Sequence, residues 1–530
     1  MQEGACMSTL SSVYLCYDLK GIQAFIFAIP RLRYICGGSA LVDIFDRQTA
    51  EKCASTASSL LFSGGGKGAY VCESSVAAES LREKLVAAAH ECGLSISFGC
   101  DADYNEAAHM TTASFPYLPE SLEGEPCTQS GLYPVEGKRP HPVVKKRGEQ
   151  RWHYEEELLK GLTLGDFTKD GLTFFSNVSD KDAEEWTDGD AGCKTLGSRN
   201  RWAVICMDGN NMGDQHRKAV DSLSEPTKYQ EWLRAMSQSL DDCTRTACKQ
   251  GIGEVAAAWF YDKERAGDKA YSRDGKLILP IRPLLVGGDD VVVLCHVDYA
   301  FQFVRSVACA FHEASVRLAD QYRKSSRSSG SELWPASGKD GLTISAGVLF
   351  APVGLPLSTA IVQAEQLLAS AKQRGRKEKV EKAVPVPACV DWESVTEGLV
   401  DTIQRRRQRD LLFVDGDINT SVSLTTRPCT LDELCGIEKL AEGYKAIPGT
   451  IRHQVLPEMR KAQGDRRVFV ERIRKHQAAL AADLDEKAKG RWRSISVDKG
   501  MLILCTDVID ALLLLEESSR MARKTAGERS

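Results

Sequence analysis

The stretch Leu284-Leu-Val-Gly-Gly-Asp-Asp-Val-Val-Val-Leu-Cys295 decides the fold of this 530-residue chain. Two apolar runs flank two adjacent glycines, and such glycines tolerate the positive φ that a tight hairpin turn requires. We therefore predict a β-hairpin about Gly287 and Gly288, with strands Pro283–Val286 and Val291–Cys295. The acids that follow the glycines would stand in its solvent-facing turn.

The segments on either side of this hairpin complete a regular order of strands and helices. Apolar runs predict further strands, and apolar residues at spacings of three and four predict helices. The order is strand, helix, hairpin, helix, strand, helix, which suits an α+β sheet with antiparallel strands and helices on one face, as in palm and ferredoxin-like folds. The predicted strands are Trp202–Met207 and Leu342–Phe350, and the predicted helices begin near Pro226, Tyr299 and Ser358.

Much of this pattern occurs twice in the chain. Gly93-Leu-Ser-Ile-Ser-Phe-Gly99 matches Gly341-Leu-Thr-Ile-Ser-Ala-Gly347 at five of seven positions. Within the first copy, Leu60–Cys72 repeats the strand, Gly-rich turn and strand, and an apolar run ending at Asp18 corresponds to the run ending at Asp208. Because three elements recur in the same order, we infer a divergent internal duplication.

Stretches rich in Gly, Pro, Ser and charged residues divide the chain into four units. The fold class is α+β, with two ferredoxin-like or palm domains, one degenerate and one with the Gly-Gly-Asp-Asp turn. The units are a first palm-like domain over residues 1–116, a connecting region over 117–199, a second palm over 200–382 and a C-terminal helical domain over 383–530. One of the dividing stretches, Tyr117–Gln150, is predicted to be a loop.

Composition excludes several classes of protein. Lys and Arg number 68 against 73 Asp and Glu, a net charge of −5, which argues against coating nucleic acid by bulk electrostatics. The basic cluster Lys138–Arg151 is interpreted as solvated charge, with RNA contact as the alternative. No apolar run approaches the ~20 residues needed to cross a bilayer, and no secretory leader is evident, so we expect a cytoplasmic protein without a membrane partner.

Cysteine usage points to packing rather than to metal binding. The chain has 18 Cys but no C-x-x-C pair, and several lie singly in apolar strands, where a reduced thiol behaves as a small hydrophobe. Cys243 and Cys248 lie five apart on a predicted helix, and we expect them to pack in the core.

Three carboxylates carry the predicted chemistry. Asp208 ends one strand, and Asp289 with Asp290 occupies the turn of a neighbouring hairpin, so they would meet at one edge of the sheet. Such a cluster repels itself unless cations fill it, and two Mg²⁺ ions about 4 Å apart can activate a 3′-hydroxyl and stabilise a leaving pyrophosphate. Nucleotidyl transfer is therefore the predicted reaction, with Lys372 on the last helix placed to neutralise a triphosphate. For Gly-Gly-Asp-Asp alone, an ordinary surface turn is the alternative.

At these residues the sequence resembles a known family. The second copy resembles the cyclase palm of the large subunit of type III CRISPR effector complexes, and the first copy resembles its degenerate first palm, so the resemblance covers roughly residues 13–382. It rests on Met207–Gly213, Val286–Asp290, Thr343–Gly347 and Ala364–Lys372 in the second copy, and on Asp18–Ile26, Gly37–Leu41 and Ser63–Lys67 in the first.

The resemblance implies a substrate, a product and roles for individual residues. ATP would lie between the two palms, and cyclic oligoadenylates would form by attack of a 3′-hydroxyl on an α-phosphate, with Asp208, Asp289 and Asp290 catalytic. The metal ligands for Mg²⁺ or Mn²⁺ would be Asp208, Gly209, Asp289 and Asp290. The nucleotide-binding residues would be Ser63, Gly64, Gly65, Gly66 and Lys67 in the first copy, and Gly287, Gly288 and Lys372 in the second.

The sequence also departs from this family. No His-Asp dipeptide occurs, so we do not expect DNA cleavage, and the connecting region offers only Cys127 and Cys193, so we expect no structural zinc. An acid is usual two positions after the first Asp, but Asn210 stands here, which we expect to weaken one metal contact or to shift nucleotide choice.

Alternatives remain open at this stage. The chain is either a complex subunit, whose C-terminal helical domain would contact guide RNA and other effector subunits, or a stand-alone signalling enzyme. Its product is either a cyclic oligoadenylate or a cyclic dinucleotide of the kind that diguanylate cyclases make. A third reading is a non-catalytic nucleotide-binding scaffold in a ribonucleoprotein, which would have no need for a self-repelling acidic cluster.

Overall fold

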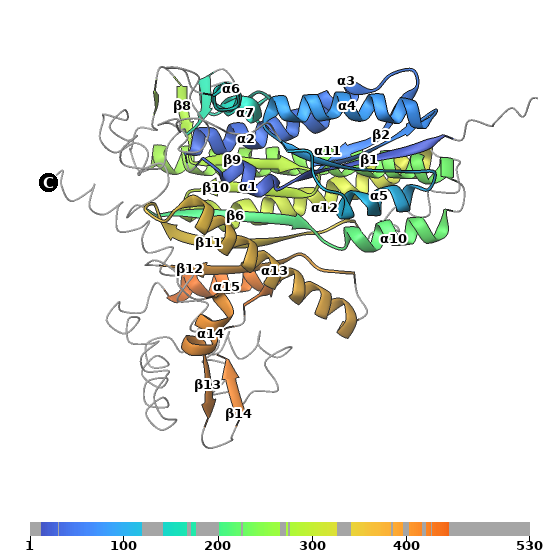
Figure 1. The fold of residues 1–530 in the computed structure, drawn as a ribbon. Helices are drawn as coiled ribbons and strands as arrows, with labels where there is room; N and C mark the ends of the chain where they lie inside the picture. Colours follow the sequence, from blue (N-terminus) through green and yellow to red (C-terminus); the bar gives the residue numbers. More distant parts are fainter. Residues whose placement is uncertain are drawn as a thin grey trace, which may run out of the picture.

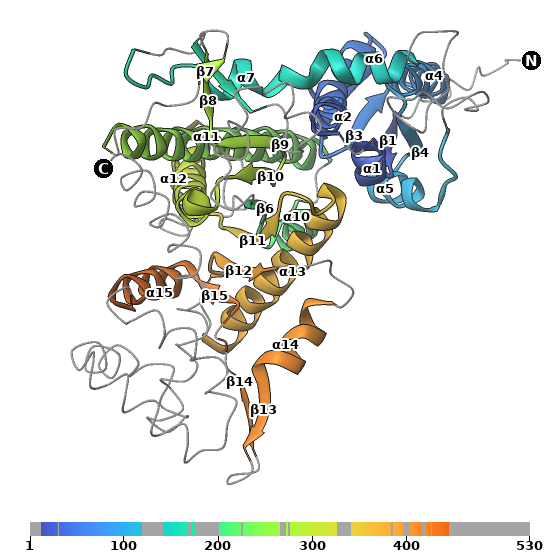
Figure 2. The same cartoon turned by 90° about the vertical axis from the view of Figure 1, so that its left-hand side faces the viewer.

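The structure is a computed structural model, and Figures 1 and 2 show two sheet-and-helix units with a smaller group of elements beyond the second. It describes residues 12–29, 31–118, 141–166, 171–175, 201–223, 226–265, 272–273, 276–325, 341–382, 385–395, 402–415, 420–423, 425 and 427–444.

The first unit is an antiparallel sheet covered by helices. Its strands lie in the order β2-β3-β1-β4. Buried apolar residues of β1, β3 and β4 form its core with α4, which is a helix with Ser74 as its N-cap. The strands are β1 (Val13–Lys20), β2 (Ser58–Gly64), β3 (Lys67–Cys72) and β4 (Ser95–Asp101). The helices are α1 (Ile22–Phe27), α2 (Leu32–Ile44), the π-helical η1 (Phe45–Thr49), α3 (Ala50–Cys53), α4 (Ser75–Cys92) and α5 (Tyr104–Ala113).

The second unit repeats this topology. Its first four strands lie in the order β9-β10-β6-β11, which is the order of the first sheet element for element. The predicted succession of strand, helix, hairpin, helix, strand and helix is confirmed. The strands are β6 (Arg201–Gly209), β9 (Ile281–Gly287), β10 (Asp290–Cys295) and β11 (Ile344–Pro352). The helices are α10 (Met212–Ser222), α11 (Pro226–Arg265), the short η5 (Val297–Tyr299), α12 (Ala300–Ser325) and α13 (Leu357–Lys382).

The repeated sequence has a packing explanation. A Cβ on Gly99 would lie 1.9 Å from the carbonyl oxygen of Ala107 in α5, and a Cβ on Gly347 would lie 2.1 Å from that of Ala364 in α13. In each unit the glycine therefore lets the last helix lie directly against the last strand. The two matching segments thus make the same contact between a helix and a strand, which is the result expected from a duplication.

The sheet of the second unit continues beyond residue 382. Strand β12 (Cys389–Ser394) pairs in parallel with β11, and β15 (Cys429–Thr430) pairs with β12, because Val390 and Trp392 supply fully buried apolar side chains. The remaining elements are α14 (Ile403–Leu411), α15 (Leu431–Tyr444) and the β13 (Leu412–Asp415) and β14 (Thr420–Ser423) hairpin, which projects from the body in Figure 1. The described part of the predicted C-terminal helical domain therefore contains strands as well as helices. Residues 445–530 lie outside the described residues, and with them most of the predicted RNA-binding unit.

The described part of the connecting region packs on both units instead of forming an open loop. It includes α6 (Pro142–Glu149), the short η2 (Gln150–Trp152) and α7 (His153–Leu158), and β5 (Leu172–Phe174) pairs with β8 (Lys276–Leu279), which pairs with β7 (Ser272–Arg273). Arg147 of the basic cluster is fully buried, with its guanidinium 3.9 Å from the centre of the Phe25 ring. A Cβ on Gly37 would lie 1.7 Å from the Arg147 carbonyl oxygen, so α6 lies against α2. Arg147 therefore packs against an aromatic ring and is not solvated charge.

Helix α11 joins the two units. It packs on α12 to form the largest core (Figure 2), and it contacts β2 of the first unit as well as β9 of the second. Cys243 and Cys248 lie buried in this core, as predicted. Helix α2 of the first unit also contacts β9. None of the helices that the structure describes is long and apolar enough to cross a membrane.

Candidate active site between the two units

The site begins with the turn between β9 and β10. Gly287 pairs with Asp290 across the hairpin, so Gly288 and Asp289 form the turn. Gly288 adopts φ +59°, which only glycine adopts readily, whereas Gly287 ends the strand without a positive φ. The hairpin is therefore confirmed, with its turn one residue later than predicted.

Strand register brings the predicted acids together. Asp290 lies directly opposite Asp208 in the pairing of β10 with β6. The backbone N–H of Gly209 donates to the carbonyl of Asp289 over 3.2 Å, and a Cβ on Gly209 would lie 2.9 Å from the Asp289 Cβ. Gly209 thus allows Asp289 to sit beside Asp208.

The electrostatics of these carboxyls favour uptake of a proton or a cation. Burial, followed by the charges of Asp208 and Asp290, raises the pKa of Asp289 far above its ordinary range. Asp290 opens to a pocket whose walls shield it from bulk water, and this desolvation together with Asp208 raises its pKa to about 7. Lys372 of α13 lowers both pKa values, and its Nζ forms an ion pair with Asp208 Oδ2. The three acids and Lys372 form one cluster.

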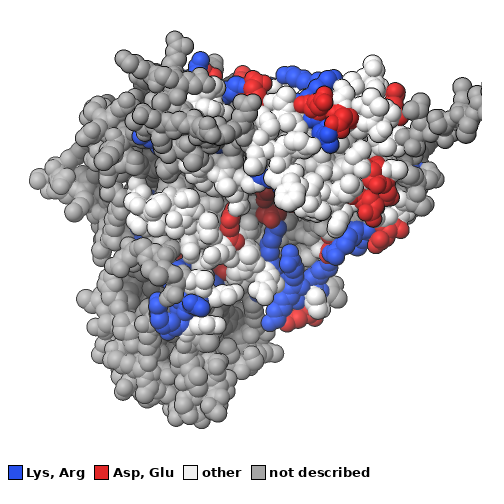
Figure 3. All heavy atoms as spheres, in the orientation of Figure 1, with Lys and Arg blue, Asp and Glu red and all other residues white. Residues whose placement is uncertain are grey.

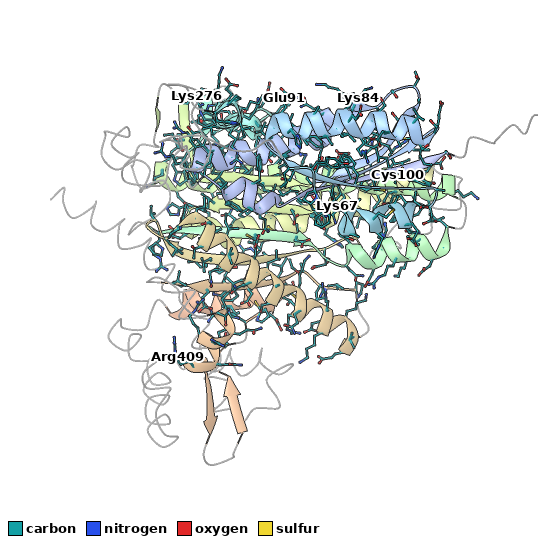
Figure 4. The ribbon with its side chains drawn as sticks, viewed as in Figure 1. Lys67, Lys84, Glu91, Cys100, Lys276 and Arg409 are labelled. Atoms are coloured by element: carbon teal, nitrogen blue, oxygen red, sulfur yellow. The ribbon has the colours of Figure 1, made fainter. Side chains whose placement is uncertain are left out.

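A cavity of about 810 Å³ lies between the two units beside this cluster. Both hairpins line it, through Ser63, Gly64 and Gly65 of the first and Gly287, Gly288 and Asp290 of the second. Gly66 is a buried residue of the first turn, and Lys67, labelled in Figure 4, is exposed and pairs in register with Asp18. Of the five predicted first-unit residues, three therefore face the cavity.

Sequence analysis missed the carboxyl beneath the first turn. Asp46 of η1 accepts from the Gly66 N–H over 2.7 Å, and the Ser63 hydroxyl, itself hydrogen-bonded to Tyr17, lies 3.3 Å from Asp46. Asp46 is only 5% exposed, and burial raises its pKa to about 7. No motif in the sequence marks it, because Asp46 lies in a short helical segment 17 residues before Ser63.

Further cavity residues come from α1, α11 and α13. Arg234 of α11 donates to the carbonyls of Leu60 (2.8 Å) and Leu61 (3.3 Å) on β2 of the first unit. Gln23 and Glu365 also line the cavity, and the exposed Gln23 amide of α1 donates to Glu365 of α13 over 2.6 Å. These contacts join the two units around the cavity, and their residues carry no signal in the sequence because each acts across a long sequence separation.

The comparisons with known proteins address this region directly. Residues 201–381 match the family model described as Cas10/Cmr2, second palm domain. Residues 201–381 are a Cas10/Cmr2 second palm. This confirms the resemblance read from the second copy of the repeat. No curated protein sequence matches the chain.

Solved structures give weaker likenesses over a longer stretch. A Csm1–Csm4 cassette in complex with cA3 is 11% identical, with a TM-score of 0.49, covering 97% of this chain and 71% of that one. The Csm1–Csm4 subcomplex of a type III-A CRISPR-Csm interference complex is 13% identical, with a TM-score of 0.49 and coverage of 96% and 71%. Because these sequence identities and TM-scores are low, only residues 201–381 are assigned, and they are assigned to the Cas10/Cmr2 second palm.

The Asn210 side chain of the Cas10/Cmr2 palm forms hydrogen bonds with neighbouring segments of the second unit. Its side chain is buried and donates to Thr343 Oγ over 3.0 Å, with the Pro387 carbonyl at 3.4 Å. It therefore ties the end of β6 to the start of β11 and to the segment before β12. The predicted influence of Asn210 on a metal contact stays a prediction.

A basic band leads away from the acidic cluster along the palm. Figure 3 shows Lys and Arg side chains gathered over α13 and toward α10. Arg376 and Lys377 of α13 and Arg217 and Lys218 of α10 are exposed, and Lys379 lies 3.4 Å from Asp214. The palm therefore offers anions a positive surface next to Lys372.

Proposed function

We propose that this chain is a metal-dependent nucleotidyltransferase that converts ATP into cyclic oligoadenylates in CRISPR-type antiviral defence. The observation that carries the proposal is the meeting of Asp208, Asp289 and Asp290 in one cluster, with Asp290 at the wall of a cavity lined by both hairpins, within a Cas10/Cmr2 palm. A cavity of about 810 Å³ falls in the range of ligand sites, roughly 300–1,000 Å³.

The residues present fit Mg²⁺ or Mn²⁺ by their chemistry. Carboxylate oxygens are the ligands such hard cations prefer, and the raised pKa values of Asp289 and Asp290 show how poorly the site tolerates its own negative charge. Among the described residues, no three His, Cys, Asp or Glu side chains converge as a finished metal site. In this structure Lys372 balances Asp208, so a cation there competes with the Lys372 ammonium. When bound, the metal would supply Lewis-acid activation of a 3′-hydroxyl and of a leaving pyrophosphate.

The chain's own groups account for nucleotide binding. Gly287 and Gly288 let a ligand approach the backbone of the second hairpin, and Lys372 with the basic band gives the phosphates positive partners. Ser63, Gly64 and Gly65 would contact the second nucleotide from the opposite wall. Effector subunits and guide RNA are proposed partners of the C-terminal unit.

The test is product formation. Purified protein is incubated with Mg²⁺ or Mn²⁺ and each nucleoside triphosphate, alone and mixed, and the products are identified by mass spectrometry. The Asp289→Asn/Asp290→Asn variant should form none. A matched control, Glu79→Gln/Glu83→Gln on the exposed face of α4, removes the same charge far from the cavity and should keep full activity.

Other outcomes point to other functions. A guanylate or mixed cyclic dinucleotide would replace the adenylate product while keeping the metal-dependent site. Tight nucleotide binding with no product in any mixture, with or without added RNA, would contradict turnover and leave a nucleotide-binding scaffold. Unchanged synthesis by the double variant would overturn the assignment of the three acids.

A further inference from the structure

The turn that carries Asp289 and Asp290 is held by side chains from outside its own sheet. Asp241 Oδ1 of α11 accepts from the Gly288 N–H over 3.2 Å. Thr244 Oγ, one helical turn further on, lies 2.6 Å from the Gly288 carbonyl and donates to it, with the Leu240 carbonyl at 2.9 Å as the alternative acceptor. Both backbone polar groups of the positive-φ glycine are thus bound by one helix face.

Arg245 fixes the position of this helix face. The Arg245 side chain is 5% exposed and donates from Nε to Asp241 over 2.8 Å. Its other nitrogens bind Glu157 of α7, over 3.0 Å, and Asp43 of α2. Asp43 also lies 2.6 Å from His153 Nε2. One buried guanidinium therefore links α11 to the first unit and to the connecting region.

The first unit contains a similar contact at its own turn. There the Gly66 N–H donates to Asp46, which lies on the helical segment that precedes the first hairpin, as α11 precedes the second. The two units share a strand order but have diverged in the turn residues themselves. An acid that binds a turn N–H is therefore a feature of both copies, apart from the residues proposed for catalysis.

We infer that Asp241 and Thr244 are positioning residues that hold the Gly288 backbone, and that Arg245 ties their position to the first unit through Asp43. This inference rests on the proposed function in one respect, namely that the carboxylates of the turn bind a catalytic cation. A turn held at both backbone groups presents its carboxylates in one orientation, which spares a bound cation the cost of ordering them. Asp241 also lines the cavity, whereas Thr244 does not, so the main test uses Thr244.

The main test is Thr244→Val, which removes the hydroxyl at nearly constant shape. Three properties are measured without nucleotide: Mn²⁺ affinity by electron paramagnetic resonance, hydrogen–deuterium exchange of the peptide spanning residues 285–291, and the thermal midpoint. We expect about tenfold weaker Mn²⁺ binding, the scale of loss for groups that orient metal ligands, and faster exchange at the turn. Thr244→Ser should restore both properties, because it returns the hydroxyl.

The matched control is Thr111→Val in α5. Thr111 donates to the Ala108 carbonyl within its helix, as Thr244 does to Leu240, but its hydroxyl has no partner in a catalytic turn. It should alter neither Mn²⁺ affinity nor exchange at residues 285–291. Asp241→Ala and Asp43→Ala provide second variants, expected to act in the same direction, with Asp43→Ala the weaker because Glu157 and Asp241 still hold Arg245.

The outcomes separate this inference from the proposed function. Wild-type Mn²⁺ affinity and wild-type turn exchange in Thr244→Val would overturn the positioning role. Faster turn exchange in Thr244→Val, reversed by Thr244→Ser, would support it even if the parent protein makes no product. A drop in thermal midpoint equal to that of Thr111→Val, with no change at the turn, would mark Thr244 as an ordinary helix residue.

Discussion

The two hairpins have the same place in the same topology but differ in the acids that they carry. In the first, residues 63–67 include no acid, and Asp46 of η1 is buried beneath the turn and accepts from the Gly66 N–H. In the second, Asp241 of α11 has the corresponding role, and the turn region itself adds Asp289 and Asp290, of which Asp290 lines the cavity. A helix supports the turn in both units, so the difference lies in the acids that the second hairpin adds.

The strand register shows which residues of the two hairpins correspond to each other. Lys67 pairs with Gly64 and lies opposite Asp18, just as Asp290 pairs with Gly287 and lies opposite Asp208. The first unit therefore places a cation where the second places an acid. This difference would confine the proposed two-metal site to the second unit, while both hairpins line the cavity.

The largest expected effect separates these matched positions. Asp290→Asn should lower product formation by more than about 10³-fold, because it removes a carboxylate whose charge the proposed metal would need. Lys67→Ala should change the rate by less than about tenfold, since Lys67 is exposed and outside the cavity lining. Initial rates by mass spectrometry measure both. Equal losses of rate in Asp290→Asn and Lys67→Ala would contradict the different roles of the two hairpins.

The next effect concerns the pH dependence of stability. The pKa of Asp46 is raised to about 7 in the folded protein, so its stabilising contribution is complete below about pH 4 and is lost as pH rises through 7. The difference from an ordinary carboxyl corresponds to a free energy on the order of 4 kcal/mol. The thermal midpoint of the parent should therefore fall between pH 5 and pH 8, and that of Asp46→Asn should fall less.

Mg²⁺ sharpens this second test. Asp289 and Asp290 also have raised pKa values and also destabilise the fold when ionised. Added Mg²⁺ should raise the midpoint at pH 8 in the parent and in Asp46→Asn alike, but not in Asp289→Asn/Asp290→Asn. If Mg²⁺ cancelled the effect of Asp46 itself, the first hairpin would be a cation site and the comparison would fail.

Turn glycines give a smaller effect that differs between the units. Gly288 has φ +59° with open space around a Cβ, so Gly288→Ala should cost about 1–2 kcal/mol of stability from backbone strain. Gly66 has φ +79°, and its Cβ would meet Ile22 Cδ1 at 2.1 Å, so Gly66→Ala should cost more stability. Thermal midpoints measure the order. Activity should show the reverse order, with Gly288→Ala the more damaging.

The sequence predicts the second unit well because its signals are local. The Gly-Gly-Asp-Asp hairpin, the strand ending in Asp208 and the α13 helix with Lys372 all follow from patterns within a few residues, and the structure brings them together. The repeat also predicts the shared topology.

What the sequence does not show depends on long-range contacts. Asp46 and Asp241 are ordinary helix residues until the fold places turn glycines against them, 20 and 47 positions away. The basic cluster read as solvated charge includes Arg147, which is buried because Gly37 leaves room for its backbone. Strand β12 was missed because its partner β11 lies beyond the long α13 helix.

The smallest expected effect tests how the two units are held around the cavity. Gln23→Ala removes an exposed hydrogen bond to Glu365 at the cavity, so stability should change by less than about 1 kcal/mol. The buried Arg245–Asp43 link and the bonds of Arg234 to β2 remain in this variant. KM for nucleotide should therefore rise only a few-fold, with kcat unchanged.

Gln302→Ala, which removes a long amide contact of 3.5 Å to the Glu254 carbonyl, is the control and should leave both constants unchanged. A large loss of kcat in Gln23→Ala alone would mean that the exposed bridge, rather than the buried ion pairs, holds the first hairpin against the second. The supporting role of α11 would then be secondary, because the cavity would depend on an exposed contact between α1 and α13.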